Sequence, residues 1–279
     1  LINTVSWYII IRSGGKTGFS FVRLYKFTVT GFALNYVTPV GLMGGEPYRI
    51  MELKPYIGIE RATSSVILYV MMHIFSHFCF WFFSIFLYLA LRPVDIAMGT
   101  ILAVVGAVSL LAIYFFMKGY KNGMAVRTLK LLQHIPFIKE WAKRFSENKR
   151  EALERVDSQI AELHKQRRST FYASLSLEFM ARIIGCLEVY FILNILTTDV
   201  SFPACILIMA FTSLFANLFF FSPMQLGARE GGFALAVGGL AIPGAFGVYT
   251  GLITRVRELI WIVIGVLLMK VGNGTPANK

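Results

Sequence analysis

One stretch combines Pro, Gly and charged residues inside an apolar part of the chain: Asn35-Tyr-Val-Thr-Pro-Val-Gly-Leu-Met-Gly-Gly-Glu-Pro-Tyr-Arg49. A looser copy of this stretch follows 184 residues later: Phe219-Phe-Phe-Ser-Pro-Met-Gln-Leu-Gly-Ala-Arg-Glu-Gly-Gly232. In both copies a Pro lies seven residues before a Glu. A duplicated, charged and helix-breaking segment in an apolar chain predicts broken membrane helices that build a central site from two repeats.

The composition is that of a membrane protein. The 279 residues are 56% hydrophobic and 15% charged, with a mean hydropathy of +0.65. A soluble domain is about 45–50% apolar and about 25% charged. Uncharged runs at 62–91, 96–117 and 200–228 exceed the roughly 18–20 residues that cross a bilayer. The sequence therefore predicts an all-α integral membrane protein, a polytopic helical bundle.

The net charge of +12 is unevenly distributed, since thirteen of the 27 Lys and Arg residues fall between 118 and 168. The positive-inside rule places such a segment in the cytoplasm of a plasma membrane protein. Attraction to lipid headgroups explains the charge better than nucleic-acid binding, because no nucleic-acid motif is present. We expect membrane lipids as partners and no nucleic acid; a homo-oligomer is compatible with the sequence.

The pattern predicts four parts. The first membrane half, 1–117, contains a re-entrant hairpin at 20–57. A cytoplasmic amphipathic helical hairpin at 118–168 follows, with apolar residues at helical spacing. The second half, 169–270, contains a re-entrant hairpin at 204–242, and the tail 271–279 is expected to be disordered. Three full spans separate the two hairpins, so they enter from opposite sides and form an inverted repeat. Residues 1–11 make half a span, and we expect the natural N-terminus to extend further.

The two motifs carry the candidate site. Pro breaks a helix and Gly lets its backbone approach a ligand. The helix after each break offers free N–H groups to an anion, arginines can bind phosphate, and each Glu can orient an arginine or meet an amino group. Alternatively, the Pro and Gly only kink packed helices and each Glu forms a structural pair. The candidate substrate-binding residues are Thr38, Pro39, Gly44, Gly45, Glu46, Arg49, Ser222, Gln225, Arg229 and Glu230.

A second set of candidates, Glu178, Arg182 and Glu188, lies in the predicted span 169–198. Glu178 and Arg182 are four residues apart and share a helix face, so they could pair. Charges at membrane depth serve either a structural ion pair or a substrate path. His73 and His77 share the same spacing, but no third ligand lies near them in sequence. Packing or proton handling is therefore favoured over metal binding, and we predict no cofactor.

The two motifs also carry a family resemblance. Asn35, Thr38-Pro39, Gly44-Gly45-Glu46 and Arg49, with the later Pro223, Leu226-Gly227 and Arg229-Glu230-Gly231, resemble the flippase-like membrane domain of lysylphosphatidylglycerol synthases. The family's second motif reads Pro-Gly-Gly-Leu-Gly-X-Arg-Glu-Gly. Met224-Gln225 replaces the Gly-Gly here, which makes this backbone less permissive.

The resemblance implies movement of a lipid between leaflets of a bacterial or archaeal plasma membrane. Bifunctional members carry a soluble aminoacyl-transferase domain after the membrane part, and we expect this chain to be a stand-alone transporter, not an enzyme. Its lipid would be a phospholipid, an aminolipid or a polyprenyl phosphate. Two alternatives remain: a membrane enzyme acting on a lipid-linked phosphate, or a non-catalytic membrane scaffold. Proton coupling through Glu46, Glu178 or Glu230 is a further hypothesis.

Overall fold

The computed structural model of the chain describes residues 1–38, 44–122, 158, 168–197, 200–219 and 225–270. Its main elements within these ranges are α1 (Ile2–Ser13), α2 (Phe21–Val37), α3 (Gly45–Ile57), α4 (Ile59–Leu91), α5 (Ile96–Asn122), α9 (Arg168–Leu196), α10 (Phe202–Leu218), α11 (Ala228–Gly238) and α12 (Gly244–Lys270). The described residues contain no strand. Nearly all of the predicted cytoplasmic hairpin 118–168, and all of the tail 271–279, lie outside the described residues.

Within the described residues, three helices are long and apolar enough to cross a bilayer: Ile59–Leu91, Ile96–Met117 and Ser169–Leu196. They coincide with the three full spans that the sequence predicts between the two motifs. The protein is therefore an all-α, multi-pass membrane protein. That the two motif hairpins re-enter the membrane from opposite sides stays a prediction.

The first hairpin is formed by α2 and α3, and its helix ends follow from the sequence. Ser20 caps α2, its hydroxyl accepting a hydrogen bond from the Arg23 N–H at 3.4 Å. Thr38 is extended, with ψ 134°, because a residue that precedes a proline avoids the helical region. α3 ends at Gly58, whose φ of 78° and ψ of 158° are accessible essentially only to glycine. α4 begins at the next residue, so the chain turns sharply.

The second hairpin, α10 and α11, is shorter than predicted. α10 ends at Leu218 and not at Ser222, since Phe219 already leaves the helical conformation with ψ 34°. α11 covers only Ala228–Gly238 of the predicted return segment 224–242. The backbone explains this difference: Gln225 and Gly227 before α11, and Ala241 after it, have φ of 53°, 77° and 61°. Positive φ cannot continue a right-handed helix.

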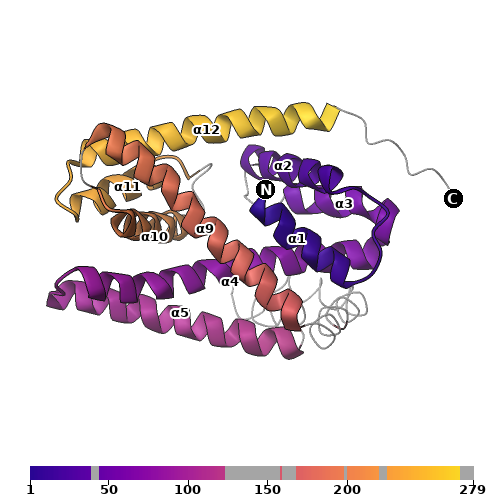
Figure 1. Ribbon diagram of the computed structural model, residues 1–279, viewed down its shortest axis with the longest axis horizontal. Coiled ribbons are helices and arrows are strands. Elements are labelled where there is room, and N and C mark those ends of the chain that lie inside the picture. Colours follow the sequence, from indigo (N-terminus) through magenta and orange to yellow (C-terminus); the bar gives the residue numbers. More distant parts are fainter. Residues whose placement is uncertain (39–43, 123–157, 159–167, 198–199, 220–224, 271–279) are drawn as a thin grey trace, which may run out of the picture.

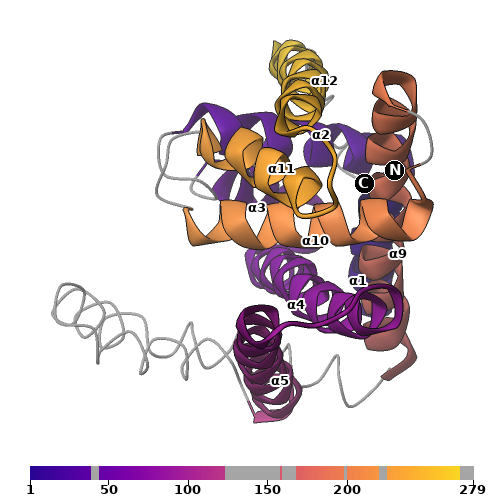
Figure 2. The same cartoon turned by 90° about the vertical axis from the view of Figure 1, so that its left-hand side faces the viewer.

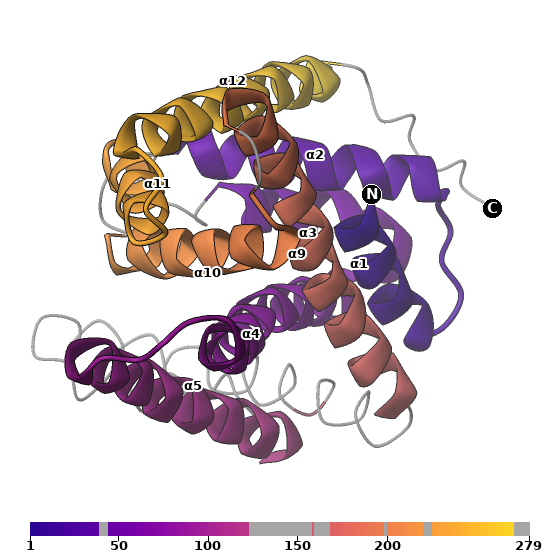
Figure 3. The ribbon, with the colours of Figure 1, turned by 60° about the vertical axis from the view of Figure 1, so that its left-hand side comes forward.

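The two hairpins lie between α12 on one side and α4 on the other (Figures 1 and 3). α12 packs against α2 and α11, while α4 packs against α3 and α10. α9 crosses the molecule and packs against α1, α4, α10 and α12, and α5 packs against α4 at the edge of the bundle (Figure 2). In each half, the helix that follows the hairpin, α4 or α12, therefore packs against the second hairpin helix of its own half and the first hairpin helix of the other half.

Each half has its own apolar core. The largest fully buried side chains of the first half come from α1, α2, α3 and α4: Trp7, Phe27, Leu53 and Phe75. Leu193 and Phe233 anchor the second core, where α9 meets α11. A third cluster joins α4 to α9 and α10 through Phe80, Trp81, Cys186 and Ile206. Van der Waals packing across this third cluster holds the two halves together.

Glycines let α12 approach both hairpins closely. A Cβ on Gly247 would lie 2.5 Å from the Phe233 carbonyl oxygen of α11. A Cβ on Gly265 would lie 2.5 Å from the Ala33 Cβ of α2. Thr30 also donates a hydrogen bond to the Gly265 carbonyl at 3.3 Å. Such close backbone contact is how membrane helices associate without a hydrophobic driving force.

Candidate functional site

The second motif places two charges in the first turn of α11. Gly227 precedes the helix, and its N–H donates to Glu230 Oε2 at 3.0 Å, so Glu230 caps its own helix. A carboxylate at this end is stabilised by the helix dipole. Arg229 is the neighbouring residue, and because neighbours on a helix do not face each other, it cannot pair with Glu230. Both side chains therefore take their partners from other helices.

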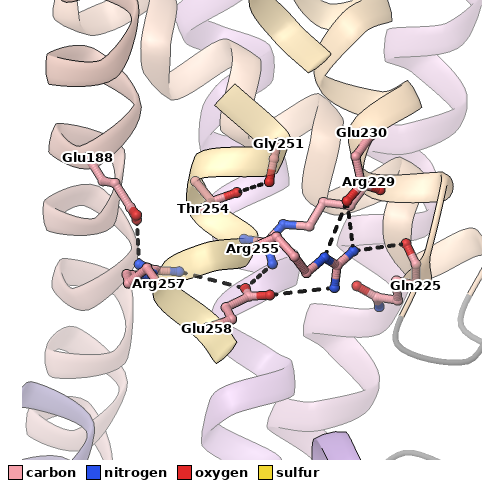
Figure 4. Close-up of polar contacts among 9 residues, drawn as sticks. All are labelled: Glu188, Gln225, Arg229, Glu230, Gly251, Thr254, Arg255, Arg257 and Glu258. Atoms are coloured by element: carbon pink, nitrogen blue, oxygen red, sulfur yellow. Dashed lines mark hydrogen bonds and ion pairs between the residues drawn. The ribbon is translucent and has the colours of Figure 1, made fainter. Parts of the chain in front are cut away.

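Those partners come from α12 (Figure 4). Arg229 forms an ion pair with Glu258. Arg255 donates to Glu230 Oε1, with Nη2 at 2.9 Å, and its Nη1 lies 3.6 Å from Glu258 Oε2. The Arg255 Nη2 also lies 3.5 Å from the Gln225 carbonyl oxygen. α11 and α12 are thus joined by alternating positive and negative groups.

The network continues outward to α9. Arg257 pairs with Glu188, and its Nη2 lies 3.7 Å from Glu258 Oε1 (Figure 4). The side chains on this path are 5% exposed at Glu258, 46% at Arg257 and 26% at Glu188, so the network is most exposed at Arg257. Three arginines and three glutamates balance one another, so the whole network carries no net charge. We call these six residues the second-motif network: Glu188, Arg229, Glu230, Arg255, Arg257 and Glu258.

Close helix packing makes this network possible. A Cβ on Gly251 would lie 3.1 Å from the Cα and Cγ of Glu230, so glycine allows α12 to run directly beside the start of α11. The first half also reaches the network, because Tyr36 near the end of α2 interacts with Glu258 and Arg229. Residues from both halves of the chain therefore meet at one polar centre.

The first motif builds a smaller cluster inside its own hairpin. Glu46 Oε1 accepts from Arg49 Nη1 at 3.0 Å and from Asn35 Nδ2 at 3.1 Å. Asn35 Oδ1 in turn accepts the Gly45 N–H at 2.8 Å. Asn35 thereby fixes the N-terminus of α3 to the end of α2. Glu46 orients Arg49, as the sequence suggests.

Arg49 is enclosed by its surroundings. Its guanidinium lies over the rings of Trp7 and Tyr69, 5.7 and 5.4 Å from their centroids, in cation–π geometry. It donates to the Thr28 carbonyl at 3.3 Å. Gly31 provides the space, since a Cβ there would lie 2.5 Å from Arg49 Nε. Glu46 Oε2 and Arg49 Nε are buried without a hydrogen bond, so this cluster retains unused polar capacity.

The remaining first-choice candidates have local contacts or lie outside the described residues. Thr38 donates its hydroxyl to the Leu34 carbonyl at 2.8 Å, and its methyl group packs where a Cβ on Gly44 would sit. Pro39 and Ser222 lie outside the described residues. The structure thus gathers Glu46 and Arg49 in one cluster and Arg229 and Glu230 in the other, and Tyr36 extends from the first hairpin to the second-motif network.

The second-choice candidates separate. Glu188 joins the second-motif network. Glu178 and Arg182 share a helix face, but each takes partners from other helices: Glu178 from His73 and Asn3, and Arg182 from Ser76. The expected pair between Glu178 and Arg182 is replaced because α4 presents polar groups to both side chains.

Sequence reasoning missed Arg255 and Glu258, the α12 partners of the second motif. The signal was available: Arg255, Arg257 and Glu258 are closely spaced charges inside a helix that is otherwise uncharged between Gly244 and Met269. Charges at membrane depth need partners, and the nearest unexplained opposite charges are those of a motif that breaks a helix.

The comparison with protein families finds one match. Residues 1–265 match the family described as the lysylphosphatidylglycerol synthase TM region. The match covers both hairpins and all six residues of the second-motif network. No curated protein and no solved structure matches the chain significantly.

Proposed function

The chain belongs to the lysylphosphatidylglycerol synthase TM family, and on this premise we propose that it is a lipid flippase. The family membership indicates a function related to membrane lipids. The finer proposal is that the protein moves a polar phospho- or aminolipid between the leaflets of the plasma membrane and performs no chemical reaction on it. The predicted sidedness, with 118–168 in the cytoplasm, is part of this proposal.

The observation that carries the proposal is the second-motif network. Charged side chains at membrane depth are costly and are retained for a function or for a strong structural contact. Here they form a continuous path between a buried glutamate, Glu258, and a half-exposed arginine, Arg257. A lipid headgroup could follow such a path while its acyl chains stay in the bilayer.

The chemistry of the network suits exchange of partners. A lipid phosphate that binds Arg229 or Arg255 takes the place of a carboxylate and makes the same charge-assisted, bidentate contacts. The displaced Glu258 or Glu230 can then meet an amino group of the headgroup. Each charge keeps an opposite neighbour throughout, which avoids the roughly 3–5 kcal/mol of leaving one partner of a buried pair alone.

The experiment measures leaflet exchange of headgroup-labelled phospholipids in liposomes that contain the purified protein. The test variant is Arg229→Gln/Glu258→Gln, which removes the Arg229–Glu258 pair and the contacts of Glu258 with Arg255 and Arg257 without changing the net charge. Loss of a charge-assisted contact costs roughly 1.5–3 kcal/mol, so exchange should slow on the order of tenfold or more. The matched control is Arg92→Gln, which removes an exposed arginine in the turn between α4 and α5.

Thermal unfolding of all three proteins in detergent checks that they are folded. Exchange that requires the protein, fails in the double variant and persists in the control supports both the function and the site. Equal exchange in all three proteins would remove the site. Absence of exchange for phospholipids, aminolipids and polyprenyl phosphates in the wild type would contradict the proposed function.

A further inference from the structure

A second polar centre lies where α9 crosses α4 and α1, and the lipid path described above does not use it. Glu178 of α9 is 1% exposed. Its Oε2 accepts from His73 Nδ1 at 2.9 Å and from Asn3 Nδ2 at 3.4 Å. Its other oxygen, Oε1, is buried and makes no hydrogen bond to any residue that the structure describes. A buried carboxylate therefore has one ionisable hydrogen-bond partner, and that partner is an imidazole.

Arg182, four residues further along α9, is directed elsewhere. Its Nε donates to Ser76 Oγ at 2.8 Å and its Nη2 to the His73 carbonyl oxygen at 2.7 Å. Both acceptors belong to α4, so the guanidinium holds α9 to α4. It also remains close enough to Glu178 for the two charges to interact.

The charge of the His73–Glu178 pair depends on a single proton. With the proton on either the imidazole or the carboxyl group, the pair has no net charge; without it, a buried carboxylate stands beside a neutral ring. The His73 side chain is 43% exposed, whereas Glu178 is covered, so the imidazole lies between the buried acid and the surface of the protein.

The internal repeat places His73 and Arg257 at equivalent positions. His73 precedes Arg257 by 184 residues, the same offset that separates Pro39 from Pro223. Each of the two pairs with a glutamate of α9, Arg257 with Glu188 and His73 with Glu178. Arginine carries a permanent charge, whereas histidine gains and loses its charge between about pH 5 and 8. One repeat therefore has a fixed cation where the other has a switchable one.

We propose that His73 and Glu178 form a proton-binding site that controls the contact between α4 and α9. One proton enters and leaves through the His73 imidazole and is shared with the Glu178 carboxylate. When it leaves, Arg182 releases Ser76 and the His73 carbonyl and turns to Glu178, the pairing that their spacing on one helix face allows. The α4–α9 tether, which consists of these two hydrogen bonds of Arg182, then opens. It closes again when the proton returns.

The site is also connected to the first motif. Tyr69 of α4 contacts Asn3, interacts with Glu178, and lies beneath the guanidinium of Arg49. The other ionisable groups around the pair are His77, whose ring centroid is 5.5 Å from that of His73, and Glu46 beyond Arg49. α10 and the described side chains of α5 carry no charged residue. A change of charge at Glu178 thus acts on Arg182 and, through Tyr69, on Arg49.

The effect on lipid movement rests on the proposed function. Because opening of the tether frees α4, which also packs against α3 and α10, we expect leaflet exchange to become faster as the pH rises from about 5 to 8. A coupling of this kind is typically worth about fivefold or more. The test compares wild type with His73→Gln and Glu178→Gln, and with Glu52→Gln, which changes a partly buried glutamate of α3, as the matched control.

Wild type and the control should show the rise in exchange, and both site variants should show a rate independent of pH. A wild-type rate that is constant or falls with pH would overturn the proposal, as would a rise that persists in His73→Gln. A second readout does not need transport: infrared difference spectra of the detergent-solubilised protein after a pH jump report protonation of carboxyl and imidazole groups.

Wild type and the control should give the same spectrum. Subtracting the Glu178→Gln spectrum from it should leave a carboxyl band, and subtracting the His73→Gln spectrum should leave an imidazole band; a subtraction that leaves no such band would overturn the proton site. If no protein exchanges lipid, the proposed function fails, and the infrared spectra still decide the proton site. Lipid exchange that occurs without the infrared change would leave the flippase and remove the proton site.

Discussion

The two motifs share a Pro-to-Glu spacing, but their charges have different neighbours. In the first hairpin, Glu46 and Arg49 pair within α3, and Arg49 is enclosed by Trp7 and Tyr69. In the second, Arg229 and Glu230 pair with residues of α12, and the contacts continue to a half-exposed Arg257. The first cluster is closed, whereas the second leads to the surface of the protein.

The difference shows what a duplicated motif conserves and what it leaves free. The repeat fixes the place where the helix breaks and the presence of a Glu at the start of the next helix. The surroundings of that Glu then depend on the helix that packs against the hairpin. α4 contributes apolar and aromatic groups next to α3, whereas α12 contributes arginines and a glutamate next to α11. Four substitutions test this contrast, in order of decreasing expected effect.

Arg49→Leu should have the largest effect on stability. It leaves Glu46 buried without its arginine, which costs about 3–5 kcal/mol of the free energy of unfolding. The counterpart in the second-motif network, Arg257→Leu, removes a half-exposed arginine and should cost less than about 1 kcal/mol. Chemical unfolding in detergent measures both. Equal losses of unfolding free energy in the two variants would contradict the distinction between a closed and an open cluster. Adding Glu46→Gln to Arg49→Leu should recover part of the lost stability.

Gly45→Ala tests the tight join within the first hairpin. A Cβ at this position would overlap the Gly31 carbonyl oxygen and lie 2.6 Å from Asn35 Oδ1, so the backbones of α2 and α3 must separate. Overpacking of this kind costs about 1–3 kcal/mol. We expect a lower unfolding temperature together with weaker protection of the Gly45 amide in hydrogen exchange. An unchanged amide would show that Asn35 does not hold the hairpin closed.

Gly227→Ala tests the second hairpin, where space is not limiting. Among the described residues, no atom lies within 4 Å of the added methyl group, but φ is 77°, which costs a residue with a Cβ about 1–2 kcal/mol. Gly231→Ala is the matched control, because it also has open space and lies within α11. The control should be neutral or more stable by up to about 1 kcal/mol. Similar unfolding temperatures for the two variants would rule out backbone strain at Gly227.

Gln225→Gly should have the smallest effect. Gln225 has a φ of 53°, so the position that reads Gly in the family motif adopts a conformation that suits glycine. Relief of this strain is partly offset by the greater freedom of glycine in the unfolded chain, which leaves a gain below about 1 kcal/mol. Gln225→Ala removes the same side chain and keeps the strain, so it should show no gain in unfolding temperature. A gain in both variants would assign the effect to the side chain.

Much of the fold follows from local sequence. Two of the three membrane spans contain the long uncharged runs 62–91 and 96–117, and the third, Ser169–Leu196, is a long apolar run with three charges. The end of α2 is fixed by Thr38 before a proline. The pairing of Glu46 with Arg49 was also predictable, since the two residues are one helical turn apart. In each case the determining residues are close in the chain, and propensity or hydropathy alone decides the outcome.

Long-range pairing could not be predicted in the same way. Arg229 meets Glu258 because Gly251 lets α12 lie against α11, and nothing near Arg229 in the sequence identifies that partner. The expected pair of Glu178 and Arg182 has the right spacing, yet His73 and Ser76 lie closer once α4 is in place. The early end of α11 depends on Ala241, a residue whose type gives no sign of a positive φ.

The uninterrupted course of α12 has a mechanical consequence. Its contacts at Gly251 and Gly265 touch α11 and α2 respectively, and fourteen residues of helix separate them by about 21 Å. A helix of this length is rigid, and it packs against both hairpins. If α12 tilts, one of its two contacts loosens while the other tightens. The two halves of the protein therefore cannot rearrange independently and must move in opposite directions.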